Sequence, residues 1–245
     1  MEAKEWIFGR HPVIEAIEAG QSIDKVWLQQ GTRGPLEKDL RRLCRANDIP
    51  LVFSPKEKLN RMVKGNHQGV VALVAAGTYQ QLEDILPHLY EQGQTPLFLI
   101  LDGVTDTRNF GAIARSAELC GVHAIIIPAK GSASLSSDAL KTSAGALARI
   151  PVCRVNSLVT TIKYLQEAGL RVLASDLSGE TYLHELDLQG PLALVLGSEG
   201  EGISKGVARA ATQCFRIPQL GTLNSFNVSV AAGIMLYETM RQRAL

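Results

Sequence analysis

From residue 97 onward the chain alternates short, wholly apolar runs with segments whose apolar residues recur at helical spacing. The runs expected to form strands are 97–101, 123–127, 152–155, 170–174, 192–196 and 214–217. Strands that are apolar on both faces must be covered on both faces, and helical crossovers make neighbouring strands parallel. The pattern therefore predicts an α/β fold with a parallel sheet, whose ligands bind beyond the carboxyl ends of the strands.

The first part of the chain shows a smaller α/β pattern. Helices are expected at 12–19, 35–47 and 55–63, and strands at 23–28, 50–53 and 69–75. Residues 76–95 are polar and rich in turn formers, with one helix-like stretch at 82–90. We therefore expect a domain at 1–75, a linker at 76–95 and a second domain at 96–245.

Charge differs between the two parts. Residues 1–75 hold 12 Lys and Arg against 9 Asp and Glu, and the remainder holds 13 against 15. The basic residues cluster as Arg33, Lys38, Arg41, Arg42 and Arg45, and then as Lys56, Lys58, Arg61 and Lys64. The clusters fit either a polyanion-binding surface or ordinary solvated helix faces.

Other classes of protein fit the sequence poorly. The four cysteines are scattered without a C-x-x-C pair, and the five histidines show no zinc spacing, so we expect reduced thiols and no metal site. No apolar run approaches the ~20 residues that a membrane helix needs. The first ten residues are charged where a signal peptide is apolar. These features predict a cytoplasmic protein without a membrane segment.

The first polar strand end runs from Asp102 to Arg115. Asn109 is expected at a helix start, and Arg115 lies six residues later, after two apolar residues. A fixed guanidinium there suits a phosphate. The local pattern also fits Asn109 as a helix cap and Arg115 in an ion pair with Glu118 or Asp102.

The second polar strand end, 197–202, contains three glycines that permit close backbone approach. It lacks the Lys-Ser/Thr ending of a phosphate loop and does not match G-x-G-x-x-G, which disfavours nucleotide hydrolysis and dinucleotide binding. Glu199 fits either a cap of the helix expected near Ser204 or an active-site carboxylate.

The third strand end, 219–226, is a polar loop that leads into a helix with Ser, Ala or Gly at every turn. Free N–H groups at the start of that helix suit a polar cofactor. The small residues indicate that another element packs very close to the helix.

Together these segments resemble the three motifs of the SpoU (TrmH-type) RNA 2′-O-ribose methyltransferases. The resemblance rests on Asn109-Phe110-Gly111-Ala112 with Arg115, on 194–202, and on Ile217-Pro218 with 225–231, in this order and spacing. It covers 97–240. In addition, residues 1–75, with Phe8-Gly9 and 67–70, resemble the L30e-like substrate domain of that family. Phe110 and Phe226 stand where the family often has Leu, and Ala148 where relatives commonly have Glu.

The resemblance implies an α/β parallel sheet with a C-terminal trefoil knot, which binds S-adenosyl-L-methionine and pairs with a second copy in a homodimer. The cofactor-binding residues that it implies are Leu196, Gly197, Gly200, Ile217, Leu220, Phe226 and Asn227. The catalytic residues that it implies are Asn109, Arg115, Glu199, Ser225 and Asn227. No metal is expected in the reaction.

The implied reaction is methylation of a ribose 2′-OH in RNA, with a guanosine of 23S rRNA as the expected target. A tRNA ribose methyltransferase of the same fold and an RNA-binding protein without activity are the alternatives. The basic helices of the first domain would bind RNA phosphates. A general nucleotide-binding protein is disfavoured because no phosphate loop is present.

Overall fold

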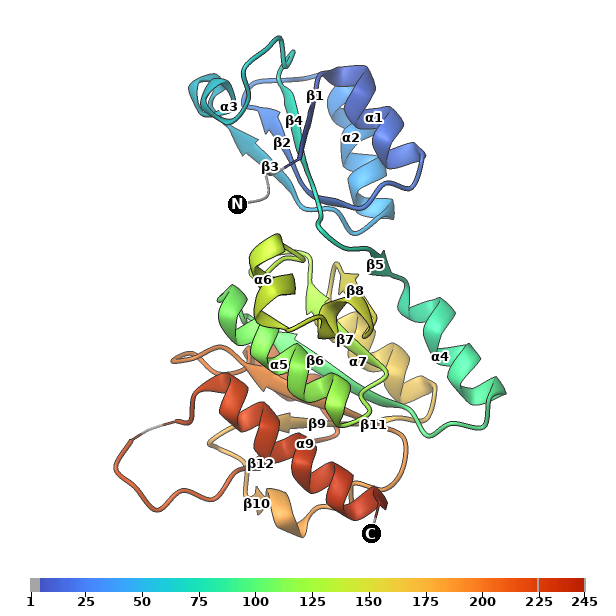
Figure 1. Ribbon diagram of the computed structural model, residues 1–245, viewed down its shortest axis with the longest axis vertical. Helices are drawn as coiled ribbons and strands as arrows, with labels where there is room; N and C mark the ends of the chain where they lie inside the picture. The colour runs from blue at the N-terminus through green and yellow to red at the C-terminus, as the bar shows by residue number, and fades with distance from the viewer. Residues whose placement is uncertain (1–4, 224, 245) are drawn as a thin grey trace. The chain divides into compact units, whose positions relative to one another are not determined.

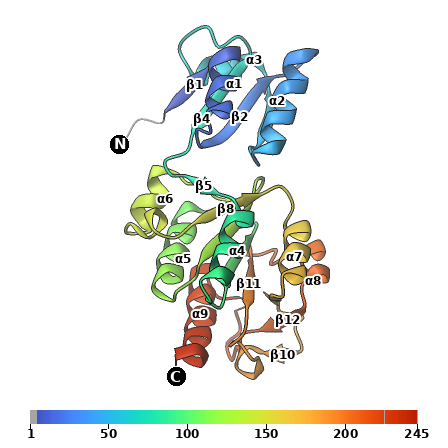
Figure 2. The same cartoon turned by 90° about the vertical axis from the view of Figure 1, so that its right-hand side faces the viewer.

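The computed structural model describes residues 5–223 and 225–244, which form two compact units (Figures 1 and 2). The smaller unit extends through Thr78 and also includes Ser134–Ser137, where the amide of Ala76 donates to the carbonyl of Leu135. The larger unit holds Tyr79–Ala133 and the chain from Asp138 onward. Each unit has its own sheet.

The smaller unit is a four-stranded sheet of order β1-β4-β2-β3, in which only β2 and β3 are parallel. Its elements are β1 (Trp6–Phe8), α1 (Arg10–Glu18), β2 (Ile23–Gln29), α2 (Pro35–Ala46), β3 (Leu51–Ser54), α3 (Lys56–Met62) and β4 (Val70–Val74). Only β1 was not expected from the sequence, because three residues are too short to show a period.

Helices cover both faces of this small sheet. Apolar residues of α1 and α2, among them Val13 and Leu40, pack with Val26 and Val70 in one core cluster. On the other face Leu59 of α3 packs with Val71, beside the two tryptophans. The unit thus has its own hydrophobic core.

The larger unit contains an eight-stranded sheet in which every pairing is parallel. Its strands are β5 (Tyr79–Gln80), β6 (Leu97–Asp102), β7 (Ala124–Pro128), β8 (Val152–Val155), β9 (Arg171–Ser175), β10 (Thr181–Tyr182), β11 (Leu192–Gly197) and β12 (Gln213–Arg216). Their order is β10-β12-β9-β11-β6-β7-β8-β5. The α/β fold with a parallel sheet is confirmed, and the apolar runs predicted it because the central strands are buried on both faces.

Helices form a layer on each face of this sheet (Figure 2). On one face α4 (Leu82–Glu91), α7 (Leu158–Glu167) and α8 (Lys205–Ala210) pack into one apolar cluster with the strands. On the other, α5 (Thr107–Leu119) contacts both α9 (Val228–Ala244) and the short η1 (Ala146–Ala148). The remaining short helices are α6 (Ser137–Thr142) and η2 (Leu183–Glu185). No helix in the described ranges is long and apolar enough to cross a membrane.

The segment expected as a linker, 76–95, holds two elements of the larger unit. β5 pairs with β8, and Leu82, Leu86 and Leu89 of α4 are buried in the core. Polar composition suggested a linker, but one apolar residue on each turn is enough to dock a helix onto a sheet. The two units therefore meet in sequence at Thr78 and Tyr79.

The strand order decides where the site lies. β12, β9, β11 and β6 are adjacent, and all four point the same way. The loops that follow them therefore gather at one edge of the sheet, where the order in which successive strands are added reverses between β6 and β11. Two of those loops carry the first two polar motifs, and the third motif follows β12.

Candidate functional site

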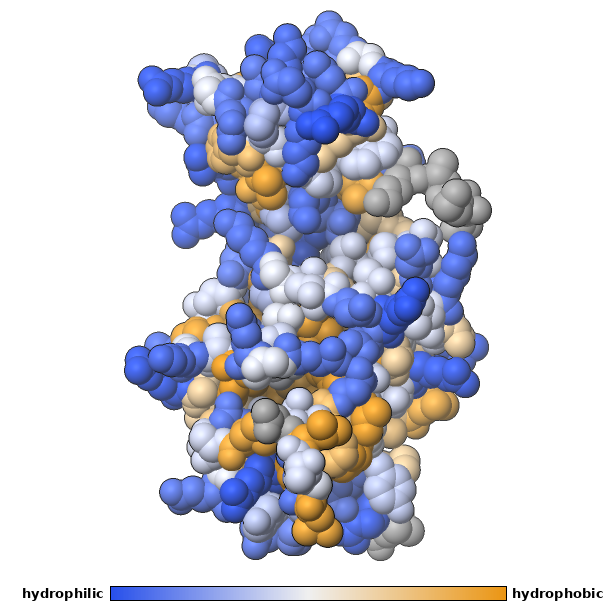
Figure 3. All heavy atoms as spheres, turned by 90° about the vertical axis from the view of Figure 1, so that its left-hand side faces the viewer, coloured by the Kyte–Doolittle hydropathy of each residue, from blue (hydrophilic) through white to orange (hydrophobic). Residues whose placement is uncertain are grey.

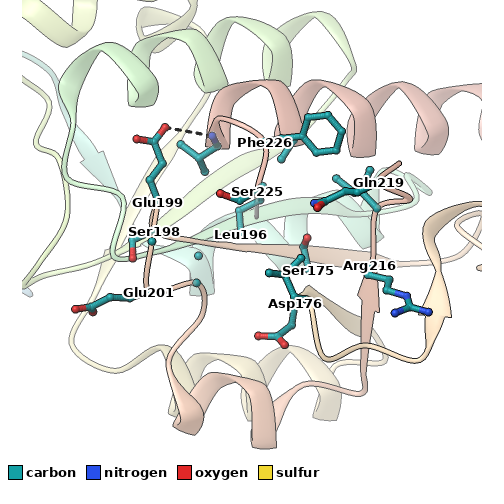
Figure 4. Close-up of a pocket in the computed structure, with 17 residues that line it drawn as sticks. Ser175, Asp176, Leu196, Ser198, Glu199, Glu201, Arg216, Gln219, Ser225 and Phe226 are labelled. Atoms are coloured by element: carbon teal, nitrogen blue, oxygen red, sulfur yellow. Dashed lines mark hydrogen bonds between the residues drawn. The ribbon is translucent and has the colours of Figure 1, made fainter. Parts of the chain in front are cut away.

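A cleft of about 460 Å³ opens beyond the carboxyl ends of β9, β11 and β12 (Figure 4). Its lining residues are Ser175, Asp176, Leu177, Leu196, Gly197, Ser198, Glu199, Gly200, Glu201, Gly202, Arg216, Ile217, Gln219, Ser225, Phe226, Val228 and Ala231. The volume and the mixture of apolar and polar lining residues are typical of a small-molecule site.

Glu199 joins three segments that are far apart in sequence. Its Oε1 atom accepts hydrogen bonds from Asn109 Nδ2 at 3.0 Å, from Asn227 Nδ2 at 2.5 Å and from the Val228 amide at 3.3 Å. Figure 4 marks the last of these with a dashed line. Asn227 Nδ2 also donates to Asn109 Oδ1 at 3.2 Å. The carboxylate therefore fixes both asparagines and the start of α9.

This network resolves the two alternatives for Glu199. The helix near Ser204 is capped by Ser204 itself, whose hydroxyl accepts from the amide of Val207. Asp102 accepts from the Ser204 amide at 2.6 Å. Glu199 instead faces α9 and the cleft, so it is not the cap of α8.

Asn109 is not a helix cap. α5 begins two residues earlier, at Thr107, and the Asp106 carboxylate accepts from the amides of Arg108 and Asn109. Those two bonds lower the pKa of Asp106 because they stabilise its charged form. With the helix start satisfied by Asp106, the Asn109 side chain is available to Glu199 and Asn227.

Gly197 leaves no room for a side chain. A Cβ there would lie 2.0 Å from the carbonyl carbon of Gly202 and 2.2 Å from the amide nitrogen of Ile203. Ser198 and Gly202 exchange two backbone hydrogen bonds, which fold 198–202 into a tight loop against that position. At Gly200 the backbone φ of +97° favours glycine.

The expected cofactor residues fall into two groups. Leu196, Gly197, Gly200, Ile217 and Phe226 line the cleft. The other two do not line it: Leu220 is fully exposed, and Asn227 is held by Glu199 at the start of α9.

The expected catalytic residues are also divided. Asn109, Glu199 and Asn227 form the network, and Ser225 lines the cleft. Arg115 is exposed on α5 and makes no hydrogen bond or ion pair within the described part of the chain. The ion-pair alternative does not hold, because Glu118 pairs with Arg149 and Asp102 accepts from Ser204.

The charge of the cleft is predominantly negative. Asp176, Glu199 and Glu201 line it. The fourth charged group, Arg216, lies with its guanidinium 4.5 Å from the centre of the Tyr182 ring and donates to the Tyr182 hydroxyl at 3.1 Å. Figure 4 shows its side chain extending away from Glu199. A cationic ligand is favoured in such a cleft.

Sequence reasoning missed the contribution of β9. Ser175, Asp176 and Leu177 follow this strand and line the cleft. The signal was present, since an apolar run at 170–174 ends at Ser175-Asp176 and ligands lie beyond strand ends. What the sequence did not show was that β9 lies between β11 and β12.

None of the four cysteines forms a disulfide, and within the described residues no group of three or more His, Cys, Asp or Glu side chains could hold a metal ion. Burial raises the pKa of Cys153 to about 12, so this thiol stays protonated and unreactive.

Known proteins match this chain along nearly its whole length. The sequence pattern of the SpoU rRNA methylase family matches residues 96–237, and that of the RNA 2′-O ribose methyltransferase substrate-binding domain matches 6–80. A Bacillus subtilis protein, YacO, described as a TrmH-family tRNA/rRNA methyltransferase, is 36% identical over 239 residues, which are 98% of this chain and 96% of YacO.

Solved structures agree. An AdoMet-bound rRNA methyltransferase from Sinorhizobium meliloti is 28% identical with a TM-score of 0.61, and the match covers 96% of this chain and 86% of that one. A tRNA-modifying TrmH/SpoU enzyme from A. aeolicus is 32% identical with a TM-score of 0.58, over 66% of this chain and 84% of that one. The site network, the parallel sheet and these matches lead to one conclusion: the chain belongs to the SpoU family of RNA methyltransferases.

Proposed function

We propose that this protein transfers a methyl group from S-adenosyl-L-methionine to a ribose 2′-hydroxyl of RNA. The observation that carries the proposal is the network in which Glu199 holds Asn109 and Asn227 at the rim of an acidic cleft. It brings together the ends of three motifs that the family resemblance assigned to one site. The S. meliloti relative, described as AdoMet-bound, supports the cofactor.

The residues of the cleft fit this cofactor. Leu196, Ile217 and Phe226 offer apolar surface, and Gly197 lets the 198–202 loop fold tightly at the cleft because no Cβ intervenes. The carboxylates of Asp176 and Glu201 favour a positively charged ligand. When bound, the sulfonium would supply an electrophilic methyl group, which needs no metal.

Within the network, Glu199 acts as a positioning residue. Its Oε1 is already engaged by three donors, so its main effect is to fix Asn109 and the start of α9. Asn227 Oδ1 accepts from the amide and hydroxyl of Ser229, which also fixes its orientation. Ser225 and the two asparagines would then orient the ribose hydroxyl.

We assign Arg115 to the substrate. A ribose hydroxyl is a weak nucleophile, and a cation beside its developing alkoxide lowers the barrier. The Arg115 side chain is exposed and unengaged within the described part of the chain, so it can clamp the target phosphate. A guanidinium keeps its proton in proteins, which argues against Arg115 as the general base.

Homodimerisation and the trefoil knot are part of the proposal. The surface of α9 holds a mainly apolar hollow, lined by Leu183, His184, Pro218, Val230, Gly233, Ile234, Tyr237 and Glu238. A Cβ on Gly233 would meet no atom within 4 Å. The sequence predicted that another element packs closely against the small residues of this helix. At Gly233 no such element is present among the described residues of the same chain. Figure 3 shows apolar surface on the larger unit, on the side that lies at the left in Figure 1. A second copy covering this surface would supply the missing contact.

We further propose that the smaller unit is an L30e-like RNA-binding domain. Its match to the substrate-binding pattern and its excess of basic residues support this. With the unit present, the chain resembles the bacterial 23S rRNA guanosine-2′-O-methyltransferase RlmB, a cytoplasmic enzyme. The second candidate is a tRNA target, which the likeness to the A. aeolicus tRNA-modifying enzyme favours.

One experiment separates these functions. The full chain is incubated with a tritiated methyl donor and total RNA, and the labelled RNA is fractionated and mapped with nucleases. Label in a 2′-O-methylguanosine of 23S rRNA supports the first candidate, and label in tRNA the second. Donor binding without transfer to any RNA contradicts both.

A further inference from the structure

The smaller unit contains a hollow of about 660 Å³ whose charge is opposite in sign to that of the acidic cleft. It is lined by Arg10 and His11 at the start of α1, Gln29 at the end of β2, Lys56 and Asn60 of α3, and the 65–69 loop. Among these described residues there is no Asp or Glu. The hollow therefore combines fixed positive charge with amide side chains.

A buried histidine fixes the direction in which Asn60 faces. The Gly69 amide donates to His67 Nδ1 at 2.9 Å, so this nitrogen carries no proton and Nε2 does. Nε2 then donates to Asn60 Oδ1 at 2.8 Å. His67 is only 4% exposed, which holds this arrangement in place. Consequently Asn60 has its N–H groups left for a ligand.

Hydrogen bonds also fix the orientation of the Gln68 side-chain amide. Its Oε1 accepts from the backbone amide of Arg10 at 3.3 Å, and its carbonyl accepts from Arg10 Nε at 3.4 Å. Its Nε2 has no partner within the described part of the chain. Gln68 therefore also presents N–H groups, beside the terminal nitrogens of Arg10 and the ammonium of Lys56. In both Asn60 and Gln68 the side-chain oxygen is engaged, so the groups that these two residues leave open are donors.

We propose that this hollow binds an unpaired nucleotide of the RNA substrate and selects keto bases, uracil or guanine. The cations would bind its phosphate, and the amide donors of Asn60 and Gln68 the carbonyl edge of its base. Adenine and cytosine present an amino donor at the corresponding position and would face donor against donor. Only unpaired bases can reach such a site, because an A-form helix hides its edges.

The basic face of α2 differs from this hollow in the chemistry of its side chains. Its hollow is lined by Arg41, Arg42, Arg45 and Ala46, with no amide side chain. Arg41 is engaged by Glu37 at 2.9 Å and lies over the Phe53 ring. Such a surface attracts phosphates of any sequence. Selection by base is thus a property of the hollow at Asn60, and it rests on the proposed RNA methyltransferase function.

The test uses the full chain and fluorescent eight-nucleotide oligo(U), oligo(C) and oligo(A), with affinities from fluorescence anisotropy. We expect oligo(U) to bind about tenfold more tightly than the other two, in line with one amide–base pair. Asn60→Asp keeps an acceptor for His67 but replaces the N–H donor, and it should reduce the preference to less than about threefold. Gln21→Glu adds the same charge at an exposed position outside the hollow and should leave the preference unchanged.

Lys56→Gln is a second variant that leaves the histidine contacts intact. It should weaken binding of all three oligonucleotides about fivefold and lower the salt slope by about one. Equal binding of the three oligonucleotides by the unmodified protein, or an undiminished preference in folded Asn60→Asp, would overturn the inference. Methyl transfer to total RNA is measured on the same preparation: transfer without base preference defeats only this inference, whereas no transfer defeats the proposed function.

Discussion

The cleft of the larger unit and the hollow of the smaller unit are built alike and charged oppositely. Each is lined by residues next to strand ends and by glycines with a positive φ. The cleft is lined by Asp176, Glu199 and Glu201, whereas the hollow is lined by Arg10 and Lys56. An acidic cleft suits a cationic methyl donor and a basic hollow suits RNA phosphates, so in the proposed reaction the cleft would hold the donor and the smaller unit would bind RNA outside the target nucleotide.

Substitution of Arg115 gives the largest expected effect on this separation of donor binding from RNA binding. Arg115 is a cation in the larger unit, but it does not line the cleft. Arg115→Ala should reduce methyl transfer about 1,000-fold, since charge stabilisation of the transition state is lost. Donor affinity, measured by isothermal titration calorimetry, should be unchanged. Arg209→Ala, which removes an equally exposed arginine from α8, is the matched control. Undiminished transfer by Arg115→Ala would remove this residue from the mechanism.

Gly197→Ala tests the cleft alone. The added methyl group would collide with the backbone of Gly202 and Ile203, so the 198–202 loop must move. We expect donor affinity to fall about 100-fold, because overpacking costs about 1–3 kcal/mol and the loop is displaced as well. Gly221→Ala is the control, since its Cβ would meet no atom within 4 Å. Normal donor binding by folded Gly197→Ala would show that the donor binds elsewhere.

The substitution Glu199→Gln removes the charge of the carboxylate but keeps the size of the side chain, so it tests what the charge contributes to the network. The amide can accept fewer hydrogen bonds than the carboxylate and brings an N–H group toward two asparagine donors. The turnover number should fall about 30-fold, since losing one such positioned group typically costs 10- to 100-fold. Glu201→Gln removes a charge from the same cleft without touching the asparagines. An equal loss in both variants would mean that only the negative field of the cleft matters.

Reversing the charge of Arg41, Arg42 and Arg45 tests the smaller unit. RNA affinity should fall about tenfold at moderate salt, and the slope of log affinity against log salt should become shallower by about two to three. The loss should be the same for oligo(U) and oligo(C). If RNA affinity and its salt slope do not change, the basic face of α2 takes no part in RNA binding.

The sequence predicted the parallel sheet well, because fully buried strands leave an unmistakable apolar run such as 97–101. It was wrong about 76–95, where the polar exterior of α4 concealed three buried leucines. The motifs identified Glu199 and Asn227 as candidate site residues. Their spacing in the sequence could not predict that both form hydrogen bonds with Asn109. Asp176 was missed for a related reason, since its place in the cleft depends on strand order.

By itself, the sequence determined the local choices: which segments are strands or helices, where glycine is required, and which polar residues follow a strand. Those properties depend on neighbours along the chain. Only the tertiary structure decided that the end of β9 joins the cleft, that a single carboxylate oxygen holds Asn109, Asn227 and α9, and that Arg115 lies outside the cleft. The contacts in this network join residues from 28 to 118 positions apart, and the order in which parallel strands pair fixes them, which local sequence does not encode.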